Sequence, residues 1–156
     1  LLPSGALDST FGTGGRTTVG FDLAPNARDG ADGAGGVVVQ GDGRIVIATT
    51  VGLSGSDAGV KQAALARLLP DGSLDPSFGG GDGKLNLDLE PDGGTGEESS
   101  SLTAVALDSR GRIVAGGWGE WADPDLAFSI ARFESSCLFA DGFESGDTAA
   151  WSSAVP

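Results

Sequence analysis

The chain has 156 residues, enough for one domain or a short array of repeats, and its 22 acidic against 9 basic residues give a formal net charge of −13. A surface this acidic repels nucleic-acid phosphates and anionic lipid headgroups, so we expect no binding to nucleic acid or to membrane surfaces. No stretch approaches the roughly 18 apolar residues of a membrane helix, so we expect no membrane insertion. The absence of His and the presence of one cysteine, Cys137, exclude imidazole-based catalysis, an internal disulfide and a cysteine-based zinc site.

The predicted elements are short β-strands. Glycine (28 residues) and aspartate (16 residues) are turn formers rather than helix formers, which favours an all-β chain with many tight turns. Stretches rich in β-branched, aromatic or alternating apolar residues then predict strands, in chain order, at residues 16–23, 36–40, 44–51, 63–69, 84–89, 102–108, 112–118 and 128–133. The turns at 41–43 and 109–111 end in glycine, which supplies the positive φ of a tight hairpin.

The strongest pattern is an internal repeat with a spacing of 65 to 68 residues. Three separate blocks recur, namely 1–12 (LLPSGALDSTFG) as 68–79 (LLPDGSLDPSFG), 43–48 (GRIVIA) as 111–116 (GRIVAG), and 65–68 (LARL) as 130–133 (IARF). We therefore predict two units, 1–67 and 68–133, each of four antiparallel strands, followed by a tail at 134–156.

The repeat also decides the conformation of one ambiguous segment. Residues 60–69 (VKQAALARLL) contain good helix formers, and local propensity alone predicts a helix there. The equivalent residues 128–133 (FSIARF) favour a strand, and equivalent segments share a conformation, so we predict a strand for both. For the same reason the equivalent residues Ile45 and Ile113 are predicted to be buried alike.

The run at 66–79 (ARLLPDGSLDPSFG), with 42–48 (DGRIVIA) upstream of it, resembles the delta-60 repeat of bacterial surface and secreted proteins. Both copies match, and together they cover residues 1–133. The resemblance implies β-propeller blades of four strands and says almost nothing of a ligand. Two blades cannot close a ring, since propellers typically have about four to eight.

Residues 139–151 (FADGFESGDTAAW) form the most distinctive part of the tail. They are similar to a short motif near the carboxy termini of secreted bacterial proteins, and also to the opening of jelly-roll carbohydrate-binding modules. Asp141, Glu144 and Asp147 offer oxygen ligands for calcium, but their spacing fits no EF-hand-type loop, so we interpret them as turn caps. Phe143 and Trp151 are then expected to pack on the second unit.

Cys137 lies between the second unit and the tail. In a secreted chain a single cysteine serves in intermolecular pairing or in lipid or surface attachment, or is a buried small hydrophobe, and all three roles stay open. The first residues match the end of a fourth strand without a preceding Met, which fits a chain cut after a secretory signal or a piece of a longer array. We therefore expect an extracellular or cell-surface location.

Three classes of function fit these observations to different degrees. Two blade-like units leave strand edges unpaired, which predicts an extracellular structural protein that self-associates through those edges into a homo-oligomer, ring or filament. The alternative is a piece of a longer secreted propeller that binds a small ligand or calcium at the turns 29–33 and 79–83. A hydrolase that uses carboxylates alone is supported by no particular pair of residues, so we predict no catalytic residue, no cofactor and no metal.

Overall fold

In this computed structural model the structure describes residues 5–21, 33–52, 60–87, 89, 99–120 and 126–133. These residues form seven β-strands and no helix, so the predicted all-β class is confirmed. The same residues contain no helix long and apolar enough to cross a membrane. The tail, with Cys137, Phe143 and Trp151, lies outside the described residues.

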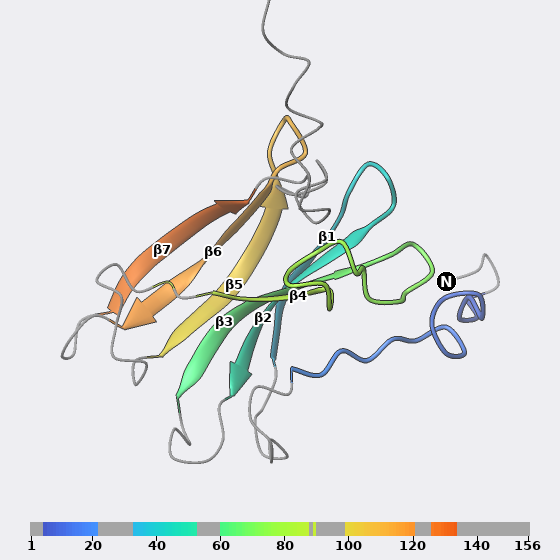
Figure 1. Cartoon of the computed structure of the whole chain (residues 1–156), viewed down its shortest axis with the longest axis horizontal. Coiled ribbons are helices and arrows are strands. Elements are labelled where there is room, and N and C mark those ends of the chain that lie inside the picture. The colour runs from blue at the N-terminus through green and yellow to red at the C-terminus, as the bar shows by residue number, and fades with distance from the viewer. Residues whose placement is uncertain are drawn as a thin grey trace, which may run out of the picture.

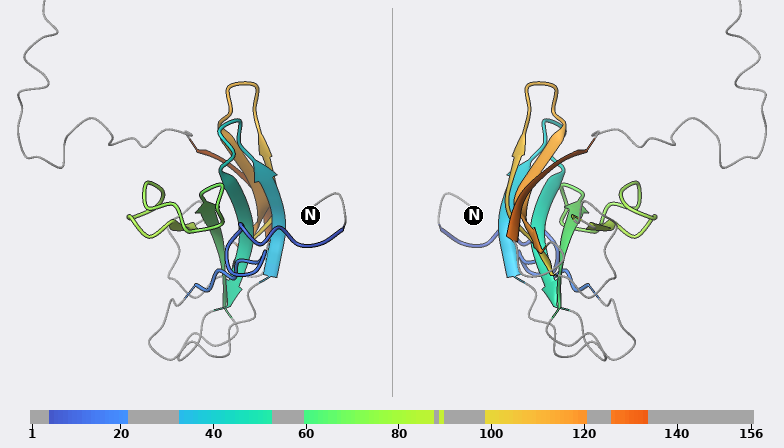
Figure 2. Two further views of the ribbon diagram at one scale, coloured as in Figure 1. Left: turned by 90° about the vertical axis from the view of Figure 1, so that its right-hand side faces the viewer. Right: turned by 90° about the vertical axis from the view of Figure 1, so that its left-hand side faces the viewer.

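The strands form two antiparallel sheets (Figure 1). The first sheet has the order β1-β2-β3-β4, and its strands are Gly33–Val39, Ile45–Gly52, Lys61–Leu68 and Lys84–Leu87. The second has the order β5-β6-β7, with the strands Ser100–Leu107, Ile113–Glu120 and Leu126–Phe133. β5 contacts β1, β2 and β3 and so joins the two sheets, while the long β3–β4 connection projects to one side of the strands (Figure 2).

An irregularity shared by the two sheets shows that the sequence repeat is also a structural repeat. The pairing of β1 with β2 shifts register between Ala34 and Gly36. The pairing of β5 with β6 shifts register between Leu102 and Ala104, at the positions that lie 68 residues further along. A β-bulge bends its strand and increases the local twist, so the first two strands of each unit have the same local shape.

The hairpin turns and the ambiguous segment have the conformations predicted for them. Gly43 (φ 85°) and Gly111 (φ 77°) end the β1–β2 and β5–β6 turns in the left-handed region that favours glycine. Residues 61–68 are extended and form β3, whose last six residues are buried. Because β3 pairs on both sides and packs on both faces, tertiary contacts override its helix propensity.

Two strand predictions need correction. Residues 16–21, the described part of the predicted strand at 16–23, form only an isolated bridge between Arg16 and Gly12. The predicted strand at 84–89 forms at Lys84–Leu87, but it pairs with β3 and completes the first sheet instead of opening the second. The second sheet therefore has three strands among the described residues, not four.

One physical rule explains both corrections: a strand needs a neighbour that accepts and donates its backbone hydrogen bonds. Residues 84–87 find that neighbour in β3 of their own chain. Residues 16–21 are their repeat equivalents, but no strand among the described residues lies beside them as a pairing partner.

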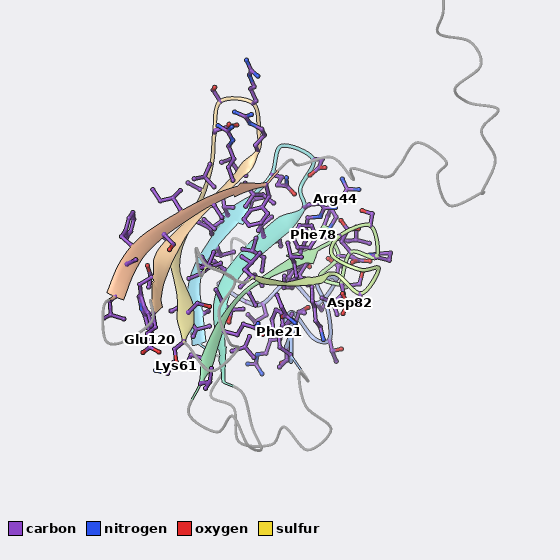
Figure 3. All side chains as sticks on the ribbon, turned by 60° about the vertical axis from the view of Figure 1, so that its left-hand side comes forward. Phe21, Arg44, Lys61, Phe78, Asp82 and Glu120 are labelled. Atoms are coloured by element: carbon purple, nitrogen blue, oxygen red, sulfur yellow. The ribbon has the colours of Figure 1, made fainter. Side chains whose placement is uncertain are left out.

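The main core lies between the two sheets, where side chains fill the space (Figure 3). Its fully buried members are Val46, Ala48, Ala63, Leu65, Ile113 and Ala115. The predicted alternation in 84–89 is confirmed, since Leu85, Leu87 and Leu89 contribute to this core and Asn86 is exposed. A smaller cluster on the opposite face of the first sheet contains Phe21.

The two units bury opposite faces of their sheets. Ile113 is 0% exposed, whereas its equivalent Ile45 is partly exposed and the adjacent Val46 is buried instead. The prediction that Ile45 and Ile113 are buried alike is therefore wrong. The sheets stack head to tail, so one face of the first meets the other face of the second, and equivalent residues cannot both point into the shared core.

Candidate functional site

Six aspartates shape the turns of the described chain. In each of them Oδ1 accepts a hydrogen bond from the backbone N–H two residues later; they are Asp8, Asp42, Asp71, Asp75, Asp82 and Asp108. This arrangement is an Asx turn, in which the carboxylate replaces a backbone acceptor. The predicted ligand segment 79–83 is one such turn, because Asp82 accepts from the amide of Lys84 at 3.0 Å.

The other predicted ligand segments fall largely outside the described residues. Of the segment 29–33, the structure describes only Gly33, where β1 begins. Asp141, Glu144 and Asp147 are not among the described residues, so their roles as turn caps or calcium ligands stay predictions. Within the described part of the chain, no three acidic or cysteine side chains gather into a potential metal site.

A buried ion pair holds the β3–β4 connection against β3. Arg67 Nε donates to Asp75 Oδ2 at 2.8 Å, and the two side chains are 4% and 2% exposed. Arg44 Nε donates to the same oxygen at 2.9 Å, and the Arg67 guanidinium lies 4.7 Å from the centre of the Phe78 ring. Burial raises the pKa of Asp75, but hydrogen bonds from Ser77 and the charge of Arg67 outweigh it and lower the pKa to about 2.

The segment 5–21 repeats this turn, with no arginine paired to its aspartate among the described residues. Asp8 Oδ1 accepts from the amide and the hydroxyl of Thr10 at 3.0 and 2.6 Å, as Asp75 accepts from those of Ser77 at 2.9 and 2.6 Å. The hydrogen bond from the hydroxyl of Thr10, and to a lesser extent the one from its amide, lower the pKa of Asp8. In the described chain Asp75 has two salt-bridge partners and Asp8 has none. The repeat makes the two turns equivalent, and the structure shows that, among the described residues, an arginine pairs only with the aspartate of the second turn.

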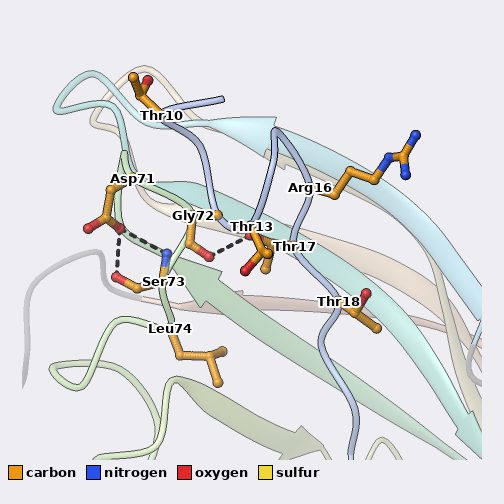
Figure 4. Close-up of a pocket in the computed structure, with 10 residues that line it drawn as sticks. Thr10, Thr13, Arg16, Thr17, Thr18, Asp71, Gly72, Ser73 and Leu74 are labelled. Atoms are coloured by element: carbon orange, nitrogen blue, oxygen red, sulfur yellow. Dashed lines mark hydrogen bonds between the residues drawn. The ribbon is translucent and has the colours of Figure 1, made fainter. Parts of the chain in front are cut away.

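A polar hollow of about 730 Å³ lies between the segment 5–21 and the β3–β4 connection (Figure 4). Its polar walls include Thr10, Thr13, Arg16, Thr18, Asp71 and Ser73. Asp71 already accepts from Ser73 inside this wall, so it shapes the turn as well as facing the hollow. The hydroxyls of Thr13 and Thr18 and the guanidinium of Arg16 can form hydrogen bonds with a small polar ligand.

Large apolar side chains are exposed on two edge strands. On β1, Val37 and Val39 are 65% and 60% exposed, and on β7, Leu126, Phe128 and Ile130 are 65%, 76% and 65% exposed. The three β7 residues alternate along the strand, so they share one face of the second sheet. Sequence reasoning missed both surfaces, because alternating apolar residues on a strand predict a buried face and do not say whether anything covers it.

Comparison with known proteins supports the propeller resemblance over part of the chain. Residues 40–78 match the family described as "Domain of unknown function (DUF5122) beta-propeller". The matched residues start next to the β1–β2 turn, include β2 and β3, and end at Phe78 beside the buried Arg67. No curated protein and no solved structure matches the chain. The chain is thus similar to a propeller-forming repeat family, in agreement with its two blade-like sheets.

Proposed function

We propose that this chain is an extracellular structural building block that self-associates into a ring or filament at a cell surface or in a matrix. The observation that supports it is the placement of apolar surface. Five of the six large apolar side chains that are exposed in the described chain lie on the edge strands β1 and β7. An apolar edge strand is a template for another strand, and proteins that remain monomeric cover, charge or twist such edges.

The net charge of −13 is compatible with this role. Contacts between apolar strands act at short range, while repulsion between exposed charges is screened beyond ~8–10 Å in ordinary salt. Acidic outer surfaces then limit sideways aggregation and keep assemblies dispersed. The proposal gives the chain a passive role without catalysis, and the commitment of six aspartates to turns supports that view.

The mass of the full chain in solution tests the proposal. We expect sedimentation velocity at micromolar concentration to show species several times heavier than 15.4 kDa. The fraction of these species should grow with protein concentration, because association follows mass action. A single species of 15.4 kDa at every concentration would contradict self-association.

A second candidate function is favoured by the polar hollow of about 730 Å³. In this alternative the chain is a piece of a longer secreted propeller that binds calcium or a small polar ligand there. Thermal unfolding in calcium chloride, or in a neutral hexose, should then occur at a higher temperature than in buffer. Asp71→Asn should remove the effect and the matched turn variant Asp82→Asn should keep it. Equal unfolding temperatures with and without both probes would reject this alternative.

A further inference from the structure

We infer that copies of this chain join head to tail, with residues 16–21 of one copy serving as the fourth strand of the second sheet of the next copy. This inference rests on the proposed self-association and names its interface. The interface pairs β7 of one copy with residues 16–21 of the other. It also places the outward face of the second sheet (Leu126, Phe128 and Ile130) on the outward face of the first (Val37, Val39, Ile45 and Ile47).

The segment 5–21 already has the conformation of the segment that ends in β4. The amide of Phe11 donates to Asp8 O at 3.1 Å, and the equivalent amide of Phe78 donates to Asp75 O at 3.1 Å. The isolated parallel bridges that follow these turns are equivalent as well. Side chains in 16–21 are alternately exposed and more buried, as in a strand, although no strand of the described chain pairs with them.

The position of 16–21 on the first sheet is also that of a fourth strand. Val19 and Phe21 pack in one cluster with Val51 on the outward face. In the second unit Leu89, the equivalent of Phe21, lies against Gly119, the equivalent of Val51. Residues 16–21 therefore lie where the fourth strand of a further sheet, stacked on the first, would lie. The described residues supply no other strand of that sheet on this side of the first sheet.

The second sheet has its first three strands but no fourth strand in the described chain, so β7 has no partner on its outer side. In the complete first sheet, Ala63 of β3 lies opposite Leu87 of β4. The equivalent residues are Phe128 in β7 and Val19 in the segment 16–21. Figure 1 shows β7 and the blue segment 5–21 on opposite sides of the molecule, so this pairing requires a second copy.

The exposed face of β7 is equivalent to a face of β3 that is buried in the first unit, where the second sheet covers it. Phe128 and Ile130 occupy the repeat positions of Ala63 and Leu65. In the first unit Ala63 and Leu65 are 0% exposed, because the second sheet covers them. In the second unit nothing described covers Phe128 and Ile130, which are 76% and 65% exposed.

The exposed face of β1 follows the same rule in the opposite direction. Val37 and Val39 occupy the repeat positions of Val105 and Leu107. Val105 and Leu107 pack against the core between the sheets, whereas Val37 and Val39 are mostly exposed. The two free faces are therefore the two halves of the interface that the chain already forms internally, which makes the contact between copies a continuation of that interface.

The contact between copies has a wider spacing near β5. A Cβ at Gly35 would lie 2.2 Å from Leu102 O, so the β1 and β5 backbones are in close contact within the chain. Thr103 takes the place of Gly35 in the second unit, and its side chain keeps the next copy further away. Phe128 in the place of Ala63 supplies additional volume on the same face. The interface between copies is therefore centred on β6 and β7.

The equivalents of the buried ion pair and of its aromatic neighbour also lie at the two ends that the inference joins. Arg132 is the equivalent of Arg67, and Asp8 is the equivalent of Asp75. Within the described residues Arg132 and Asp8 form no salt bridge, while Arg67 and Asp75 form one at 2.8 Å. Head-to-tail joining brings Arg132 of one copy to Asp8 of the next, beside Phe11, which takes the place of Phe78.

Charge reversal tests the inference. We expect Arg132→Asp and Asp8→Arg each to weaken association at least about tenfold in sedimentation velocity, because each places like charges at the interface. Mixing the two variants should restore association, since Asp at 132 then meets Arg at 8. The control Arg110→Asp makes the same change of charge in an exposed turn and should associate like the unaltered chain. Circular dichroism checks that every variant keeps its β structure.

Disulfide trapping tests the register. In a Cys137→Ser background, the pair Thr18→Cys and Ser129→Cys should link copies covalently, because these positions are equivalent to the paired residues Asn86 and Ala64. The pair Arg16→Cys and Ser129→Cys is displaced by two residues and should link far less.

The outcomes separate this inference from the proposed function. An unaltered chain that assembles, with charge variants and cysteine pairs that behave like their controls, would overturn the interface and leave self-association standing. An unaltered chain that stays monomeric would overturn both.

Discussion

At the residue scale, equivalent positions in the two units have different energetic roles. Ile113 is fully buried between the sheets, while Ile45 lies on the outward face of the first sheet and is partly exposed. A similar contrast separates Asp75, which has a buried arginine partner, from Asp8, which has none in the described chain. The cost of a substitution therefore depends on which face of the stack the residue occupies.

The first prediction uses the two isoleucines. Ile113→Ala should lower the free energy of unfolding by about 2–5 kcal/mol, because it leaves a cavity in a packed core. Ile45→Ala should cost clearly less, since its side chain keeps part of its contact with water in the native chain. Urea denaturation of both variants, at one protein concentration, measures the difference. Equal losses would contradict the opposite burial of the two units.

The second prediction concerns acid. The pKa of Asp75 is about 2 in the folded chain and 3.8 without its partners, so its ionised form stabilises the fold. The gain, about 2 kcal/mol, is present above pH 3.8 and is lost as the pH falls towards 2. Asp75→Asn should therefore unfold in less urea than the unaltered chain at pH 7, with a smaller difference at pH 2. Asp71→Asn, in an exposed turn, is the control and should have a small effect.

At the element scale, the close approach of β1 and β5 depends on the absence of a side chain. Gly35 lies at the bulge of β1, where a Cβ would meet the backbone of Leu102 at 2.2 Å. The alanines of β3 play a related part, because small side chains on both faces of a central strand let two layers pack closely on it. Here residue size, more than hydrophobicity, decides how the elements fit together.

The third prediction tests this contact. Gly35→Ala should destabilise the chain by about 1–3 kcal/mol, because the backbones of β1 and β5 must move apart to admit the methyl group. Gly33→Ala adds the same methyl group at the start of β1, where no atom lies within 4 Å, and is the control. Thermal unfolding followed by circular dichroism compares the two. A control that loses as much as Gly35→Ala would point to backbone entropy instead of the close contact.

At the scale of the whole molecule, a net charge of −13 opposes association while apolar edge strands favour it. Each copy carries the same charge, so repulsion between copies is long-ranged at low ionic strength. Strand pairing and apolar contact are short-ranged and change little with moderate salt. Added salt should therefore weaken the repulsion between copies more than the apolar contact, and so favour association.

The fourth prediction follows from that balance. Raising sodium chloride from about 0.02 to 0.3 M shortens the screening length from roughly 20 Å to below 10 Å and should increase the mass of the assemblies. Light scattering at fixed protein concentration measures the change. Arg132→Asp, which carries additional negative charge at the interface, should stay less associated than Arg110→Asp at every salt concentration. Assemblies that dissolve as salt is added would indicate an interface held mainly by exposed ion pairs.

Much of the fold could be predicted from local sequence. The composition indicated an all-β chain, glycines at 43 and 111 placed two hairpin turns, and the repeat overrode the helix propensity of residues 61–68. The turn-forming aspartates followed from the chemistry of their side chains. No local pattern identified Asp8 and Arg132 as the equivalents of a buried ion pair, because the pair between Arg67 and Asp75 is visible only in the structure.

The sequence by itself determined seven of the eight predicted strands, two hairpin turns and the equivalence of the two units, because these depend on backbone preference, side-chain alternation and a repeat that can be read along the chain. The tertiary structure decided which strand completes which sheet and which face of each sheet is covered. Lys84–Leu87 joins β3, residues 16–21 pair with no described strand, and Ile45 and Ile113 face opposite ways. The physical reason is that strand pairing and side-chain burial each require a second segment of the chain. A local sequence pattern describes only the first segment.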